Sequence, residues 1–339
     1  MKIQEVARRA GVSIATVSRT INNSSVVDPK TAKRVWKVVE ELGYYPNSQA
    51  RSLVSGKSRI LGLIVSDITN PFFPELIKGF EDVAIHNGYE ILVSSTDYDS
   101  ARMAVCVRRM LERKVEGVAI MTSEMDKHLV DQLAHRNVPM VFLDVRPAGE
   151  GISHVEVDYA MGVNEAVEHL LSLGHRRIAF ISGPLGLKSA RIRRTAFLRA
   201  LNRYGIDEDK RLVGEGDHTV DGGLNAMTRM LALGGLPTAV LASNDLTAIG
   251  TMRAVRRAGL SVPQDISVVG FDDIRLAEFT EPPLTTVRLP RNELAELAFG
   301  ALIRNVDGQA KTRSDGKLET HLVIRESTCP VRAPAVSER

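Results

Sequence analysis

The chain has 339 residues, which exceeds the usual size of one domain, so two or three domains are expected. Its 44% hydrophobic and 25% charged residues are typical of a globular protein, and two cysteines are too few for a disulfide framework or a CxxC metal site. The first residues, MKIQEVARRAG, carry charges where a signal peptide is apolar, and no apolar run approaches the roughly 20 residues of a membrane span. We therefore expect a cytoplasmic protein without a membrane partner.

The net charge of +3 is unevenly distributed along the chain. Residues 1–59 contain eleven Lys and Arg against four Asp and Glu, a net charge of +7, whereas the rest contains 33 bases and 37 acids, a net charge of −4. A small basic segment attached to a mildly acidic body indicates that the segment binds a polyanion. A solvated lysine-rich surface is the alternative that charge alone leaves open.

Apolar residues at helical spacing predict three short helices within residues 1–46. The first ends at Gly11, and the second follows Ser13, which can cap its N-terminus. The third begins at Asp28-Pro29, where Asp is a suitable cap and Pro fits the first helical position, and it ends at Gly43. Three short helices with a tight turn between the first two are typical of a helix-turn-helix unit.

A polar linker at residues 47–59 precedes a body of alternating strands and helices. Continuous Val/Ile/Leu runs predict strands at 60–65, 90–94, 117–121, 140–143, 177–181, 212–215, 239–242 and 267–271. Helices are expected between them, for example at 75–86, 101–113, 162–173, 189–204 and 245–258. The alternation indicates parallel strands and occurs twice, so the body is predicted to form two doubly wound α/β lobes with ligands bound beyond the carboxyl ends of the strands.

Seven stretches in this order resemble the LacI/GalR family of bacterial transcription regulators, from Ile3 to about Glu326. They read IQEVARRAGVSIATVSRTINN, PNSQARSLVSGKSRILGLI, ITNPFF, LSLGHRRIAFISG, ASNDLTAIG, ISVVGFDD and PPLTTV. The resemblance implies a repressor that binds double-stranded operator DNA as a homodimer or a dimer of dimers, associated with the nucleoid when bound. It also implies a body like periplasmic sugar-binding proteins, with a small effector between the lobes.

The same resemblance implies the domain boundaries. The helix-turn-helix domain is expected at 1–46, the hinge at 47–59 and the effector-binding and dimerisation domain at 60–330. The first lobe would comprise about 60–160 and 289–325, and the second about 161–288. Three crossings between the lobes are expected, near 158–162, 272–284 and 289–291.

The DNA-binding residues implied by the resemblance lie on the second helix, near its neighbours and in the hinge: Ser13, Ile14, Ala15, Thr16, Ser18, Arg19, Asn22, Thr31, Ala50 and Leu53. Arg19 can donate two hydrogen bonds to a guanine edge, whereas Ile14 and Ala15 offer apolar contacts to a thymine methyl. Short hydroxyl and amide side chains suit phosphate oxygens. Leu53 would wedge between the central base pairs. For Ile14, a place in the core of the unit is the alternative.

The effector-binding residues are expected at strand ends: Asn70, Phe73, Asp144, Ser189, Arg193, His218, Asn244 and Asp272. Carboxylates and amides beside an aromatic face suit a sugar or sugar derivative, and a purine or another metabolite remains an alternative. His218 replaces an aromatic residue frequent in the family, which would suit a more polar or anionic ligand. Leu289 stands where many members have Gln, which removes one ligand contact.

No motif of an enzyme is present in the sequence. It lacks GxGxxG after a strand, GxxxxGK[ST], HExxH and GxSxG, so no catalytic residue, metal or cofactor is expected. A sugar-binding transport protein would explain two lobes, but it would need a secretory signal and would not need residues 1–59.

Overall fold

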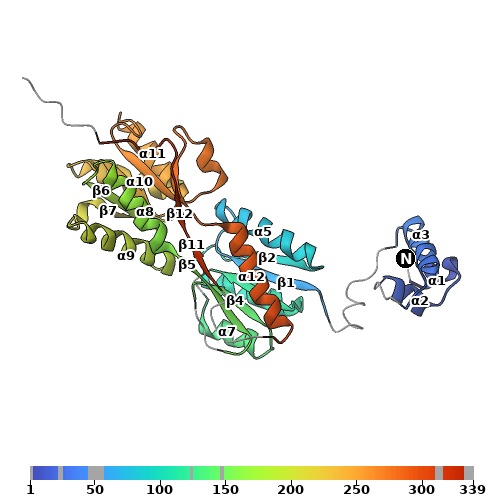
Figure 1. Cartoon of the computed structure of the whole chain (residues 1–339). Helices are drawn as coiled ribbons and strands as arrows, with labels where there is room; N and C mark the ends of the chain where they lie inside the picture. The colour runs from blue at the N-terminus through green and yellow to red at the C-terminus, as the bar shows by residue number, and fades with distance from the viewer. Residues whose placement is uncertain are drawn as a thin grey trace, which may run out of the picture. The chain divides into compact units, whose positions relative to one another are not determined.

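The computed structural model of the chain describes residues 3–21, 26–44, 57–122, 125–145, 149–309 and 316–331 (Figure 1). The chain forms two compact units, Met1–Arg59 and Ile60–Arg339. Three expected DNA-contacting residues, Asn22, Ala50 and Leu53, and most of the expected hinge at 47–59 lie outside the described residues.

The first unit contains the three predicted helices, α1 (Ile3–Ala10), α2 (Ile14–Ile21) and α3 (Pro29–Glu41). The predicted caps are confirmed, because the Thr16 amide donates to Ser13 Oγ at 3.1 Å and the Thr31 amide donates to Asp28 Oδ2 at 3.0 Å. Small aliphatic side chains from all three helices form the core: Val6, Ala7, Ala10, Val17, Val35, Val38 and Val39. Such a small core leaves most of each helix exposed, including the outer face of α2.

The first lobe of the second unit is built on a parallel six-stranded sheet with the order β11-β5-β4-β3-β1-β2. Its strands are β1 (Ile60–Val65), β2 (Glu90–Ser95), β3 (Gly117–Met121), β4 (Met140–Leu143), β5 (Ile152–Asp158) and β11 (Lys317–Glu319). Helices α5 (Phe72–His86) and α12 (Arg291–Val306) cover one face, and α6 (Ser100–Glu112) and α7 (Lys127–Ala134) cover the other. The sheet is therefore buried on both faces, as its continuous apolar runs predict.

The second lobe has the strand order β12-β10-β9-β8-β6-β7. Its strands are β6 (Ile178–Ser182), β7 (Val213–Glu215), β8 (Ala239–Ala242), β9 (Ser267–Asp272), β10 (Thr285–Arg288) and β12 (His321–Val323). Helices α8 (Tyr159–Ser172) and α9 (Lys188–Arg203) cover one face, and α10 (Val220–Ala232) and α11 (Asp245–Arg257) cover the other. Short 3-10 helices lie at Lys210–Leu212 (η1) and Arg275–Phe279 (η2). Only β12 is antiparallel to its neighbour among these strands, because it returns along β10.

The chain passes between the lobes three times, at the β5–α8 junction, between β10 and α12, and at Thr320 between β11 and β12. The crossing expected at 272–284 is wrong, because β9 and β10 are neighbours in one sheet and η2 joins them within the second lobe. The expected first-lobe segment 289–325 is likewise too long, because β12 pairs with β10 of the second lobe.

Two crossings are bonded to each other through Thr320. Its hydroxyl donates to the Asp158 carbonyl at 2.7 Å and accepts from the Gly162 amide at 3.0 Å. A Cβ on Gly162 would lie 2.2 Å from Val287 Cγ1, so the close approach of these segments requires glycine there. Among the described residues, no helix is long and apolar enough to cross a lipid bilayer.

Candidate functional site

The outer face of α2 presents the residues expected to read base edges. Ala15 and Arg19 are exposed, and Ile14 is 46% exposed, which excludes a place in the core for Ile14. Val17 and Thr20, on the inner face, are buried. The helix is therefore anchored on one side and offers an apolar N-terminal turn followed by a guanidinium on the other. A recognition helix of a helix-turn-helix protein lies in the major groove with its N-terminal residues toward the base edges.

Hydroxyl groups at the start of α2 already have local partners. Ser13 Oγ lies 2.9 Å from Thr16 Oγ1, and the Thr20 hydroxyl donates to the Thr16 carbonyl at 2.9 Å. These bonds fix the first turn of the helix. Ser18 and Thr31 are half-buried, Thr31 in the first turn of α3. Phosphate contact by Thr16, Ser18 and Thr31 stays a prediction.

A cavity between the lobes brings all eight expected effector residues together. Its walls also contain residues that sequence reasoning did not select. The complete lining is Ser66, Asn70, Phe72, Phe73, Tyr98, Met121, Thr122, Leu143, Asp144, Tyr159, Leu187, Ser189, Arg193, His218, Asn244, Asp272 and Leu289. About 80 Å³ is open to the centres of water-sized molecules, which corresponds to roughly five to eight waters. This space suits a monosaccharide-sized ligand.

Three cavity residues occupy the left-handed region of backbone conformation at strand ends or just beyond them. The φ angles are +59° at Asp144, +67° at His218 and +110° at Asp272. Asp144 directly follows β4, Asp272 ends β9, and His218 lies in the loop between β7 and α10. Non-glycine residues in this region are strained, and such strain clusters at ligand sites.

Arg193 is the buried cation of the cavity. It comes from the inner face of α9, donates to the Ser243 carbonyl, and its Nη2 lies 3.9 Å from Asp272 Oδ1. Its Cζ lies 4.8 Å from the ring centroid of Tyr159 and 4.3 Å from that of Phe271, so both rings face the cation. Its Nε has no protein acceptor, which leaves one buried donor available for a ligand oxygen.

Asp144 is held rigidly at the end of β4. Its Oδ1 accepts from the Val157 amide at 2.9 Å, and its Oδ2 accepts from the Tyr159 hydroxyl at 2.5 Å. Burial raises the pKa of Asp144 above its usual range, against the hydrogen bonds from Tyr159 and Val157 that lower it. Lys188 of the second lobe donates to the Asp144 carbonyl at 2.5 Å, which links the two walls of the cavity.

Asp272 and His218 line the cavity, and burial shifts the pKa of each side chain. Burial raises the pKa of Asp272 to about 6, and Arg193 opposes that shift. Burial lowers the pKa of His218 to about 3, so the imidazole is neutral at pH 7. Its Nε2 lies 3.0 Å from Ser243 Oγ, and a Cβ on Gly183 would lie 1.9 Å from the same nitrogen. The ring is therefore confined between a loop and a strand end.

Asn244 and Asn70 serve the backbone as well as the cavity. Asn244 caps α11 by accepting from the Thr247 amide at 2.9 Å, and it donates to the His218 carbonyl at 3.0 Å. Asn70 accepts from the Phe72 amide at 3.1 Å. Phe73 packs edge-on against Phe72, with ring centroids 5.2 Å apart, and gives the first-lobe wall an apolar surface.

Tyr159 is the most informative residue that sequence reasoning missed. It directly follows strand β5, which was not predicted, so the search for site residues at predicted strand ends did not include it. Leu289, whose apolar character was noted in the sequence, does line the cavity. Among the described residues, no group of three or more His, Cys, Asp or Glu could hold a metal ion.

A helix-turn-helix unit followed by a two-lobed body with a polar cavity defines the class of ligand-responsive DNA-binding proteins. Residues 2–47 match the model of the bacterial regulatory proteins of the lacI family, and residues 167–328 match that of the periplasmic binding protein-like domain. The chain belongs to the lacI family of bacterial regulatory proteins. The predicted family and fold class are confirmed, and the members of this family are transcription regulators rather than enzymes.

Three relatives are similar along nearly their whole length. The ribose operon repressor of Escherichia coli (strain K12) is 35% identical, over 90% of this chain and 92% of that protein. The lac repressor dimer bound to operator and the anti-inducer ONPF has a TM-score of 0.84 at 32% identity, covering 97% and 99% of the two chains. The transcriptional regulator CelR in complex with cellobiose has a TM-score of 0.73 at 32% identity, covering 96% and 99%.

Proposed function

We propose that this chain is a repressor that binds a palindromic operator as a homodimer and responds to a neutral, monosaccharide-sized effector between its lobes. Relatives named as an operon repressor and as an operator-bound dimer support the first part. The base-reading residues are Ile14, Ala15 and Arg19, with phosphate contacts from the hydroxyl groups around them. Assembly of two dimers into a tetramer remains part of this proposal.

The balance of charge inside the cavity is the observation that supports the ligand class. Arg193 is opposed by two carboxyl groups, Asp272 and Asp144, and His218 is neutral. A phosphate or carboxylate would need a surplus of cationic donors, which these groups do not supply. A neutral polyol can accept from Arg193 and donate to Asp272 at the same time.

The apolar wall completes the argument for a sugar. Phe72, Phe73, Leu187 and Leu289 line the cavity beside the polar groups. A pyranose or furanose has apolar C–H faces and a polar rim, so it matches both kinds of wall. Cellobiose, named in the complex of the CelR relative, is a neutral sugar and is consistent with this class.

Binding to chromosomal DNA requires the protein to act where that DNA lies. We therefore propose a cytoplasmic location, with association to the nucleoid when an operator is bound. The domains proposed for this function are 1–46 for operator binding, 47–59 for the hinge and 60–330 for effector binding and dimerisation.

A thermal-shift screen of the full chain tests the ligand class. Neutral monosaccharides, sugar phosphates and purine bases should be compared, with Asp272→Asn as the cavity variant and Asp207→Asn, an exposed acid of the second lobe, as the control. We expect a neutral monosaccharide to raise Tm in the wild type and the control but not in Asp272→Asn. A shift by sugar phosphates or purines alone would contradict the ligand class.

A further inference from the structure

Arg291 lies at the end of the crossing between β10 and α12 and contacts the backbone of Asp272, which lines the cavity. It is the first residue of α12 in the first lobe, and its guanidinium reaches back to the second lobe. Nη1 donates to the Asp272 carbonyl at 2.5 Å, and Nη2 donates to the Asp273 carbonyl at 2.7 Å. The side chain is only 16% exposed, so water does not replace these bonds freely. A planar guanidinium can hold two adjacent carbonyls in this way, whereas a lysine ammonium cannot hold both with the same geometry.

Glu75 completes a ring of contacts across the lobes. Its Oε2 lies 2.9 Å from Nη2 of Arg291, and its Oε1 accepts from the backbone amide of Arg275 at 3.0 Å. Glu75 belongs to α5 of the first lobe, and Arg275 begins η2 of the second. The carboxylate therefore joins the lobes directly through one oxygen and neutralises the bridging arginine through the other.

The two carbonyls that Arg291 holds belong to a strained corner. The φ angles are +110° at Asp272 and +54° at Asp273, two consecutive non-glycine residues in the left-handed region. Such a conformation persists only where the surroundings impose it.

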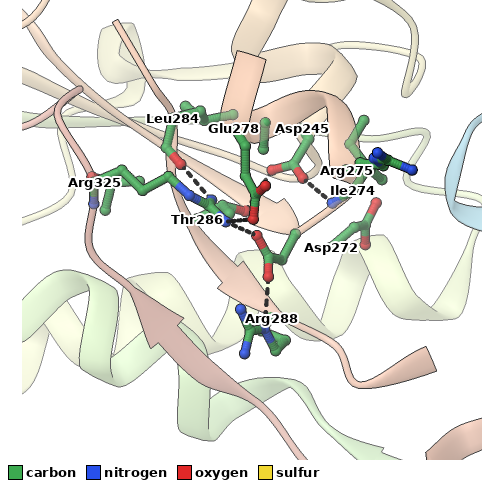
Figure 2. Close-up of polar contacts among 12 residues, drawn as sticks. Asp245, Asp272, Ile274, Arg275, Glu278, Leu284, Thr286, Arg288 and Arg325 are labelled. Atoms are coloured by element: carbon green, nitrogen blue, oxygen red, sulfur yellow. Dashed lines mark hydrogen bonds and ion pairs between the residues drawn. The ribbon is translucent and has the colours of Figure 1, made fainter. Parts of the chain in front are cut away.

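The buried carboxylate of Asp273 anchors this corner from the second-lobe side. Its Oδ2 accepts from Arg288 at 2.6 Å and its Oδ1 accepts from Arg325 at 2.7 Å, and Arg288 lies next to the crossing between β10 and α12. Figure 2 shows Arg325 also donating to the Leu284 carbonyl.

Asp245 holds the chain just beyond the corner. Its Oδ2 accepts from the Ile274 amide at 2.8 Å, as Figure 2 shows. The corner is thus fixed within the second lobe on two sides. The hydrogen bonds from Arg291 connect the corner to the first lobe.

We propose that Arg291 and Glu75 form an inter-lobe clamp, that they are positioning residues for Asp272, and that the clamp makes ligand binding and lobe closure one equilibrium. This inference rests on the proposed function, in which Asp272 contacts the effector. When the lobes separate, Arg291 leaves with the first lobe, and the carbonyls of Asp272 and Asp273 lose the guanidinium that holds them. The ligand-binding carboxylate is then oriented for binding only in the closed arrangement.

The energetic consequence is a population effect. A ligand that binds only the closed arrangement has an apparent affinity reduced by the fraction of molecules that are closed. Loss of a charge-assisted hydrogen bond changes such an equilibrium by roughly tenfold or more. The clamp therefore sets the fraction of closed molecules, and through it the apparent affinity for the ligand.

Amide hydrogen exchange of the full chain without any ligand tests the clamp. The variants are Glu75→Gln, which keeps an acceptor for the Arg275 amide but loses the charge, and Arg291→Lys, which keeps the charge but loses the fork. Glu81→Gln on the same helix α5 is the matched control. Because no ligand is added, the result is independent of whether the proposed effector class is right.

We expect exchange to rise roughly tenfold in both clamp variants at the opposite wall of the cavity, in segments 143–145 and 187–191, because Lys188 joins the lobes there by donating to the Asp144 carbonyl. Exchange in β8 and α11 should stay unchanged. The double variant should exchange no faster than the faster single variant, because either change opens the same clamp. Increases confined to 72–76 and 272–276, additive effects of the two changes, or no increase would each overturn the proposal.

Discussion

Nη2 of Arg193 lies 3.9 Å from Oδ1 of Asp272, too far for a direct hydrogen bond although the two groups are opposite in charge and buried. The two charges thus attract each other, but they form no hydrogen bond with each other. A ligand hydroxyl placed between them can accept from the guanidinium and donate to the carboxylate. This gap, rather than a closed ion pair, is what makes the centre of the cavity suited to a neutral polyol.

Base recognition is predicted to depend on Arg19. Replacing it with Ala should cost about 1–3 kcal/mol of specific binding and relax the preference at one base pair per half-site, because a bidentate contact to guanine is lost. Binding of the full chain to operator variants with each base at that position measures the effect. Lys37→Ala is the control, since Lys37 is exposed and pairs with Glu41 on α3. Equal losses on operator and random DNA would place Arg19 on the phosphate backbone instead.

Acid destabilisation is predicted to involve His218. Its folded-state pKa of about 3 lies below the usual 6.5, so the unfolded chain takes up a proton first as pH falls, and stability is lost between pH 6.5 and 3. Between pH 7 and pH 5 the wild type should lose about 2 kcal/mol more than His218→Gln. Urea unfolding at both pH values measures the difference. The idea fails if both proteins lose the same stability.

The confinement of His218 predicts a strong effect of Gly183→Ala. The added Cβ would lie 1.9 Å from Nε2 of His218 and must displace the ring or the loop. We expect a loss of about 1–3 kcal/mol in the free energy of unfolding, together with weaker ligand binding. Gly186→Ala in the same loop is the control, because a Cβ there meets nothing within 4 Å. Similar stability of the two variants would contradict the packing described for this wall.

Most of the fold can be predicted from sequence where apolar runs are continuous. The eight strands expected in the body are all present, within about one residue at each end, because buried parallel strands are apolar along their length. Strand β5 was missed since its burial alternates along ISHVEVD. Strands β11 and β12 have three residues each, too short for any periodicity. Helix α10 lies between β7 and β8, where a helix is expected, although Gly222 and Gly223 interrupt its helical pattern.

The cavity was predicted better than the crossings that shape it. Polar residues at strand ends converge because the carboxyl ends of parallel strands lie at one edge of the sheet. All eight residues expected to bind the effector therefore line the same cavity. Tyr159 and the contacts of Arg291 could not be predicted, because they depend on where the chain passes between lobes. The last crossing is a single residue, Thr320, whose hydroxyl bonds are visible only in three dimensions.

Operator binding by full-length Asp272→Asn, with and without the sugar found by the thermal-shift screen, tests the central claim most directly. The operator would be selected from random duplex DNA by the wild-type chain, and Asp207→Asn is the control. We predict that Asp272→Asn binds the operator as tightly as the wild type without ligand, and that the sugar changes operator affinity in the wild type and the control but not in the variant. A normal response of Asp272→Asn would contradict the account.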